Sequence, residues 1–341
     1  MRRALLAGLG LLVMTAAIMP AKSEAKERVR FAQTSASLLY LPLYVAEQTG
    51  IFADNGIDAE VHYFKGGGSA ALAAVIGGNM EVYLGAASSA VRGAQQTDAM
   101  IIAPLVTRYT IDLVARKGVA EKLGITSSST EVERFKALKD LKIGVSGVGS
   151  GTHQIAQYAL SRGGHHHEKD ATIVFVGGGA PAVAALAAER IDVATLSSPA
   201  SEVAVTQHGA TILVNGAGGG YSELDGYLYV ALISTKRWLD AKPEAAQRTV
   251  ASFSKAIATM RDPVQGPKAR DLVHAKHFAK TDKALFDQSW DRMLPAFAQS
   301  SKLDKAEIKR VVDFLNEFSD KPVNVDLDKV FTDKLAGSSA N

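Results

Sequence analysis

Four segments rich in glycine and hydroxyl side chains lie where a predicted strand passes into a predicted helix. They are Thr34–Ser37, Gly66–Ser69, Gly149–His153 and Gly177–Pro181. A helix N-terminus presents unpaired backbone N–H groups and a partial positive charge, so it binds anions and polar groups. Glycine lets a ligand approach the backbone closely, and serine and threonine hydroxyls add hydrogen-bond donors. These junctions predict non-covalent binding of a small polar molecule.

Two serine pairs, Ser88-Ser89 and Ser197-Ser198, also follow short apolar stretches and extend the candidate site. In open α/β sheets, the loops at the carboxyl ends of the strands bind ligands. The alternative is that the hydroxyls only cap helices, as expected for side chains in these positions. The N-caps would then be Ser35, Ser69, Ser150 and Thr152. Because four junctions converge on one predicted cleft, we favour a binding site.

The charged residues near these loops favour an anionic or a polar neutral ligand. The segments 34–37, 65–69, 86–89, 147–153, 177–181 and 196–200 contain no Asp or Glu. Lys65 and His153 do lie in them, and Arg108 follows another predicted strand. A cation site would need a carboxylate or an aromatic cage. As an alternative, each of the three basic side chains is simply solvated.

Sequence motifs of enzymes are missing. The segment 147–152 resembles a dinucleotide fingerprint, but Thr152 stands where the third glycine belongs. No G-x-S-x-G elbow, Walker A motif or H-E-x-x-H occurs. Ser150 with His153 is the one candidate nucleophile–base pair. Adjacent histidines at 165–167 with Glu168 lie in a predicted loop rather than on one helix face. We therefore expect no catalytic residue, no metal and no cofactor.

An internal repeat predicts how the junctions are positioned. Residues 66–84 and 177–195 share a glycine-rich turn, an alanine-rich helix and a short apolar strand. Upstream, Val29–Gln33 and Ile143–Gly147 are both predicted strands that run into serine- and glycine-rich turns. Two copies are too few for a solenoid. Strand–helix alternation predicts two α/β lobes with mostly parallel sheets, and ligand pockets favour the cleft between such lobes.

The order of predicted elements divides the chain into lobes. Strands are predicted at Arg28–Gln33, Asp58–Phe64 and Met100–Val106, with a helix at Leu41–Thr49. The alternation breaks at 111–140, which we interpret as a crossing into the second lobe. An apolar strand at Tyr227–Ile233 returns, and helical patterns follow from Lys242. Lobe 1 is therefore predicted to comprise residues 26–112 and 228–341, and lobe 2 residues 113–227.

Bulk properties limit the partners and the compartment. At 341 residues the chain exceeds the size of a single core. A net charge of +3 without a Lys/Arg-rich run argues against nucleic acid. Residues 1–25 have a basic start, an apolar run and a small-residue cleavage site, which predicts a cleaved signal peptide. The apolar run is shorter than the ~20 residues that span a bilayer. With no cysteine for disulfides or lipidation, we expect the periplasm.

Several segments together resemble the nitrate/sulfonate/taurine-type substrate-binding proteins of ABC importers. They are Pro42–Ala46, Gly50–Phe52, Gly56-Ile57, Leu141–Val145, Gly149–Thr152, Ala185-Leu186, Ile191-Asp192, Trp238-Leu239 and Pro243-Glu244. The resemblance covers roughly residues 28–260. It implies a type II periplasmic-binding-protein fold, in which two α/β lobes clamp a ligand. By position, the ligand-contacting loops of that family fall on Ser35, Ser37, Gly67, Ser69, Ser88, Ser150, Thr152 and Ser197. The junctions themselves add Gly149, Gly151, His153 and Gly178.

The expected function is that of a monomeric periplasmic receptor. It would bind a small organic anion, sulfonate- or carboxylate-like, and deliver it to an ABC permease in the inner membrane. Alternatives on the same fold are an enzyme, a ligand sensor and the related branch that binds thiamine-precursor pyrimidines. The cleft of that branch is expected to contain carboxylates and aromatics, and the loops of this chain lack carboxylates.

Overall fold

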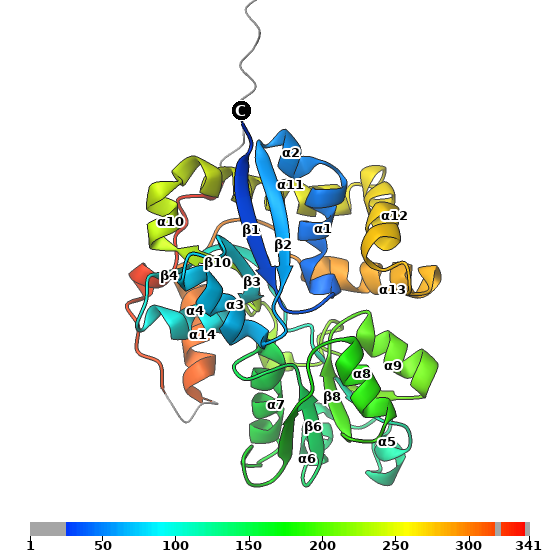
Figure 1. Cartoon of the computed structure of the whole chain (residues 1–341). Helices are drawn as coiled ribbons and strands as arrows, with labels where there is room; N and C mark the ends of the chain where they lie inside the picture. Colours follow the sequence, from blue (N-terminus) through cyan, green and yellow to red (C-terminus); the bar gives the residue numbers. More distant parts are fainter. Residues whose placement is uncertain (1–24, 318–321, 338–341) are drawn as a thin grey trace, which may run out of the picture.

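A computed structural model describes residues 25–317 and 322–337, which form two lobes, each built around its own sheet (Figure 1). Lobe 1 carries the sheet that contains the first strand of the chain, and lobe 2 carries the other. Apart from Ala25, the predicted signal peptide at 1–25 lies outside the described residues. Among those residues, no helix is long and apolar enough to cross a membrane.

The sheet of lobe 1 has five strands in the order β2-β1-β3-β10-β4. Their bounds are β1 Glu27–Gln33, β2 Ile57–Tyr63, β3 Val82–Ala86, β4 Ala99–Val106 and β10 Val230–Thr235. All residues of β3, β4 and β10 are buried. Continuous burial explains why these strands are apolar runs rather than alternating patterns.

The sheet of lobe 2 repeats this topology in the order β7-β6-β8-β5-β9. Its strands are β5 Asp112–Ala115, β6 Lys142–Val145, β7 Thr172–Phe175, β8 Val193–Leu196 and β9 Thr211–Val214. β6 therefore corresponds to β1, β7 to β2 and β8 to β3. This correspondence is the structural origin of the sequence repeat.

The prediction of mostly parallel sheets is wrong, because both sheets are mixed. β10 pairs antiparallel with β3 and β4, and β5 pairs antiparallel with β8 and β9. The remaining pairings in both sheets are parallel. Each antiparallel strand is the first that the chain forms after crossing from the other lobe. The reversal follows from the two crossovers, which local strand–helix alternation does not reveal.

Helices follow the predicted junctions. In the two repeat copies, α3 Gly67–Ile76 and α8 Ala180–Ala187 follow the glycine-rich turns. α4 Ala87–Ala94 and α9 Ala200–His208 lie at the serine pairs. Ser150 is the N-cap of α7 Gly151–Arg162, and its side chain accepts a hydrogen bond from the backbone N–H of His153. Two short helices of lobe 2 are α5 Val119–Lys122 and α6 Glu131–Lys136.

The helices that follow β10 pack mainly on lobe 1, as Figure 1 shows, and α11 and α12 contact α1 while α14 contacts α4. The helices after β10 are α10 Lys236–Ala241, α11 Pro243–Arg261, α12 Gln265–His277, α13 Lys283–Met293, α14 Lys305–Glu317 and α15 Leu327–Val330. Between β1 and β2 lie α1 Leu41–Gln48 and α2 Ile51–Asp54. Short 3₁₀ turns lie at η1 Leu38–Tyr40, η2 Ser222–Leu224 and η3 Leu294–Ala296. One large apolar cluster runs through both lobes, and a smaller one lies in lobe 2 between α8, β8 and α9.

Candidate functional site

A cavity of about 40 Å³ lies between the lobes, at the carboxyl ends of their parallel strands. Lobe 1 contributes the residues after β1, the inner end of β3 and the start of β10. Lobe 2 contributes the residues after β6, β7 and β8. Both sheets therefore present the same edge to the cavity, which is the edge where open α/β sheets bind ligands.

Some of the predicted site residues line this cavity. These are Ser35, Ser150, Gly151, Thr152, Gly178 and Ser197. They come from the junctions after β1, β6, β7 and β8, so loops far apart in the sequence meet at one place. The junction before α3 is the exception, because neither Gly67 nor Ser69 is among the lining residues.

The predicted residues Ser37, Ser69 and Ser88 join the lobes instead of lining the cavity, and Ser37 does so through the cavity residue Ser197. The hydroxyls of Ser37 and Ser197 are 2.8 Å apart and hydrogen-bonded. Ser69 Oγ donates to the carbonyl oxygen of Val148 at 3.1 Å, and Ser88 Oγ donates to Gln154 Oε1. The turns at Gly67 and Gly147 also meet, since a Cβ added to Gly67 would lie 3.5 Å from the Cα of Gly147. Gly67 has φ +77°, a conformation that favours glycine.

The hydroxyls of Ser150 and Thr152 are committed to holding their own turn. Ser150 Oγ donates to the carbonyl oxygen of Gly147 at 2.7 Å and accepts from the N–H of His153. Thr152 Oγ1 accepts from the N–H of Ser146 at 2.9 Å and lies 2.7 Å from Ser146 Oγ and 2.8 Å from Ser150 Oγ. A hydroxyl has one donor and two acceptor positions, so both groups are saturated. The capping alternative therefore holds for Ser150, which caps α7, but not for Thr152, which lies in the first turn and bonds Ser146 instead. Both side chains nevertheless line the cavity.

Three tyrosines are among the cavity residues that sequence analysis did not predict. Tyr40, Tyr83 and Tyr229 line it, and all three are almost fully buried. Among the described residues, the hydroxyls of Tyr83 and Tyr229 form no hydrogen bond. Burial raises the pKa of each phenol well above its ordinary value. Both groups therefore stay protonated and can donate to a ligand. Tyr83 lies in an apolar strand, so its sequence pattern suggests only core packing.

No charged side chain of the described residues lines the cavity. The predicted absence of carboxylates holds there, but the basic residues lie elsewhere. Lys65 is exposed and outside the lining, and Arg108 pairs with Asp225 at 3.1 Å. The donors available to a ligand thus include the phenols, the hydroxyl of Ser35 and the first-turn backbone N–H groups of α7 at Gly151 and Thr152.

The candidate enzyme pair is not formed. The imidazole of His153 does not contact Ser150 Oγ, because Nδ1 accepts a hydrogen bond from the N–H of Gly149 at 3.1 Å. Burial, followed by the nearby His167 and Arg92, lowers the pKa of His153. His153 and Gly149 line a separate groove on the outer side of the turn. Within the described ranges, no three potential metal-ligating side chains come together.

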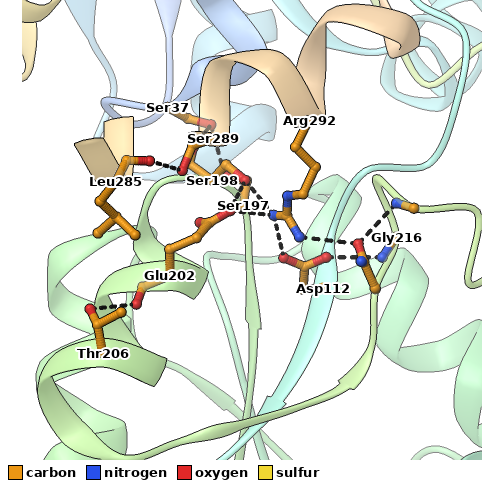
Figure 2. Close-up of polar contacts among 12 residues, drawn as sticks. Ser37, Asp112, Ser197, Ser198, Glu202, Thr206, Gly216, Leu285, Ser289 and Arg292 are labelled. Atoms are coloured by element: carbon orange, nitrogen blue, oxygen red, sulfur yellow. Dashed lines mark hydrogen bonds and ion pairs between the residues drawn. The ribbon is translucent and has the colours of Figure 1, made fainter. Parts of the chain in front are cut away.

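Arg292 is a second feature that sequence analysis missed. Figure 2 shows it reaching from α13 of lobe 1 to acidic and hydroxyl side chains of lobe 2. Its guanidinium lies 3.0 Å from Asp112 Oδ2 and 2.6 Å from Glu202 Oε1, and it donates to Ser198 Oγ at 2.5 Å. Ser198 follows the cavity residue Ser197, so Arg292 braces the cavity wall from behind. An isolated arginine in an amphipathic helix gives no sequence pattern for such a contact.

Comparisons with known proteins identify relatives of this architecture. The model of the NMT1-like family matches residues 24–273. A comparison with curated protein sequences finds no match. A solved structure of a Bordetella bronchiseptica protein is 23% identical with a TM-score of 0.76, covering 91% of this chain and 96% of that one.

Two further similar solved structures are those of ligand-binding proteins. The alkanesulfonate-binding protein SsuA of Xanthomonas axonopodis pv. citri, bound to MOPS, is 17% identical with a TM-score of 0.70, covering 92% of this chain and 100% of that one. The periplasmic nitrate-binding protein NrtA of Synechocystis is 16% identical with a TM-score of 0.71, covering 91% and 87%. These matches confirm the predicted resemblance and the two-lobed fold. The desulfurization enzyme DszB shares the fold at 15% identity and a TM-score of 0.55, so the fold alone does not exclude catalysis.

Proposed function

The chain belongs to the NMT1-like family, and on this premise we propose that it is a periplasmic solute-binding receptor of an ABC importer. It captures a small organic anion, sulfonate- or carboxylate-like, between its lobes and delivers it to a permease in the inner membrane. The observation that carries this proposal is the cavity lining, which combines uncharged donors from both lobes and contains no carboxylate.

Uncharged donors suit an anion that must be released again. The N-terminus of α7 directs a partial positive charge and unpaired N–H groups at bound anions. The phenols of Tyr83 and Tyr229 add hydrogen bonds to a charged acceptor, each worth roughly 1.5–3 kcal/mol. Without a buried lysine or arginine in the cavity, no permanent ion pair opposes release to the permease.

A cavity of about 40 Å³ accommodates only a compact group when the lobes are in contact. A sulfonate or carboxylate head fits this requirement, and the rest of an organic ligand would extend along the interlobe seam. The predicted lobe boundary after residue 112 is misplaced, because Asp112 already pairs within β5 of lobe 2. We propose that the lobes separate by hinge motion in the two connections between them, β4 to β5 and β9 to β10. The basic and apolar pattern of residues 1–25 supports export to the periplasm.

Native purification followed by mass spectrometry of the released ligand tests the proposal most directly. The identified compound should then raise the melting temperature of the mature protein without being consumed. Binding to the native state alone adds roughly 2.7 kcal/mol at 100-fold excess over Kd. A panel of sulfonates, small carboxylates, nitrate, bicarbonate and pyrimidines serves as the parallel screen. Turnover of a compound would overturn the receptor function. Tight binding of a quaternary amine instead of any anion would overturn the proposed preference for anions.

A further inference from the structure

A second concavity of about 540 Å³ lies outside the interlobe cavity and shares no lining residue with it. Lobe 2 contributes most of its lining, with residues of the turn before α7, of α7 itself and of the edge strand β7. Lobe 1 contributes Arg92, in the last turn of α4. The volume falls within the range of small-molecule sites, roughly 300–1,000 Å³. We call this concavity the outer groove.

Arg92 is the charged group of the groove that lacks a counterion. Its Nε is buried without a hydrogen-bond partner, and within the described ranges the guanidinium forms no hydrogen bond or ion pair. Burial lowers the pKa of Arg92, an effect that the nearby Tyr227 phenol partly offsets. A partly desolvated guanidinium without an acceptor is costly, and a bound anion removes that cost.

His153 adds a donor beside this charge. Because its Nδ1 accepts from the N–H of Gly149, the neutral ring carries its proton on Nε2. Arg92 is close enough to His153 to contribute to lowering its pKa. The one carboxylate of the groove lining belongs to Glu168, which is exposed and forms no ion pair with Arg92. The inner part of the groove is therefore electropositive.

The groove lining also includes apolar and accessible side chains. Phe175 is 53% exposed and Val148 is 59% exposed, although large apolar side chains elsewhere in the chain are mostly buried. The ring of Phe175 packs edge-on against His153, with centroids 5.7 Å apart. Ile173 extends the same surface along β7. Exposed apolar side chains beside an unpaired cation match an amphipathic ligand with one charged end.

We propose that the outer groove binds an aromatic organic monoanion, with its carboxylate or sulfonate group paired to Arg92 and its ring against Phe175 and Val148. Such an occupant would touch both lobes, because Arg92 belongs to lobe 1 and the remaining wall to lobe 2. It would therefore add to the nearby interlobe contacts of α4, in which Ser88 and Ser89 donate to Gln154 and to the carbonyl oxygen of Gly149. The groove is a site distinct from the interlobe cavity of the proposed receptor function.

Titration of benzenesulfonate into the mature chain, followed by calorimetry and by the imidazole NMR signals of His153, tests this site. Arg92→Gln should weaken binding about ten- to a hundredfold, since it removes a charged hydrogen-bonding partner. Arg248→Gln is the matched control, because Arg248 also has a buried Nε without a partner but lies on α11, outside the groove. Benzenesulfonamide, which is neutral and of similar shape, should bind as weakly to wild type as benzenesulfonate does to Arg92→Gln.

Two outcomes overturn the proposal. One is that benzenesulfonate does not bind wild type at millimolar concentration, or binds Arg92→Gln as tightly as Arg248→Gln. The other is that Gly151→Asp, which blocks the interlobe cavity, abolishes benzenesulfonate binding while Arg92→Gln does not. That result would place the probe in the interlobe cavity, so it would refute the groove and leave the receptor function standing. If benzenesulfonate binds the outer groove but no ligand is found for the interlobe cavity, the groove proposal stands and the receptor function is refuted.

Discussion

Arg292 and Asp112 form an ion pair that joins the two lobes, with 3.0 Å between Arg292 Nη2 and Asp112 Oδ2. Asp112 is fully buried and also accepts a hydrogen bond from the N–H of Gly216 at 2.9 Å. Burial raises the pKa of Asp112, and the Arg292 charge opposes that rise. The arginine comes from α13, whereas the aspartate begins β5, the first strand of lobe 2 (Figure 2). The pair therefore stabilises the lobe contact near a crossover.

Arg292→Met should lower the free energy of unfolding by about 3–5 kcal/mol, because it leaves a buried carboxylate without its counterion. Urea denaturation measures this change. Lys236→Met is the control, since it removes an exposed ion pair with Asp240, and such pairs contribute only about 0.3–0.5 kcal/mol. Adding Asp112→Asn to Arg292→Met should recover part of the loss. Equal effects of Arg292→Met and Lys236→Met would show that the pair is not important.

Tyr83→Phe and Tyr229→Phe should each reduce affinity for the native ligand about tenfold while changing unfolding free energy little. The reason is that each lost hydroxyl lines the cavity and has no partner among the described residues. Calorimetry with the ligand found by mass spectrometry measures the affinity, and thermal melting measures stability. Tyr44→Phe provides the contrast, because the Tyr44 hydroxyl already donates to Gln33. If neither cavity variant loses affinity, the phenols are not ligand donors.

Thr152→Val should destabilise the protein by about 1–3 kcal/mol, because it leaves the N–H and the hydroxyl of Ser146 without their shared partner. This expectation replaces the simpler view that the hydroxyl binds ligand. Chemical denaturation of the unliganded protein is the measurement. Loss of affinity with unchanged stability would instead assign the hydroxyl to the ligand.

Gly151→Ala should weaken ligand binding, although the substitution is small. A Cβ at this position would lie 2.5 Å from Tyr229 Cε2 and Oη, so the tyrosine must move out of the cavity wall. Gly78→Ala is the control for backbone strain alone, because Gly78 has φ +76° but no atom within 4 Å of an added Cβ. Comparing the two variants by ligand-dependent thermal shift separates displacement of Tyr229 from general backbone strain. Wild-type affinity in Gly151→Ala would contradict the close packing.

Acidification should destabilise the fold through His153. Its folded pKa is lowered, first by burial and then by His167 and Arg92, so the unfolded chain binds its proton more readily. Stability contributed by neutral His153 is therefore present above the unfolded pKa of about 6.5 and falls as the pH drops toward the folded pKa. Protonation would also break the acceptor role of Nδ1 toward the N–H of Gly149. As the pH is lowered from 8 to 5, the melting temperature should fall less for His153→Gln than for wild type. Identical pH profiles of the two proteins would refute this.

Local sequence signals were sufficient to predict most strands and junctions. The strands predicted at Arg28–Gln33 and Met100–Val106 appear as β1 and β4. The helix predicted at Leu41–Thr49 appears as α1, and Gly50, with φ +78°, follows its end. These features depend on neighbouring residues, so a single sequence contains them. The antiparallel directions of β5 and β10 depend on partners far along the chain, and local patterns do not encode them.

The candidate site was predictable in its loops but not in its donors. Glycine and serine identify where the backbone turns toward a cleft, but they do not determine whether each hydroxyl binds a ligand or the protein itself. Whether the Ser150 hydroxyl binds a ligand or its own turn depends on the folded backbone, which places the carbonyl oxygen of Gly147 2.7 Å from it. Tyr83 and Arg292 come from a buried strand and a distant helix. Only the packed structure brings them to the cavity and its supporting wall.

The shared sheet topology has a consequence for how the chain acquires its shape during vectorial synthesis. All strands of lobe 2, β5 to β9, lie in the continuous stretch 112–214. In lobe 1, β3 and β4 are both paired to β10, which emerges only with residues 230–235. Lobe 2 can therefore complete its sheet first, whereas β3 and β4 each keep an unpaired edge until β10 is synthesised. Until then, these apolar edges are exposed to wrong strand pairing.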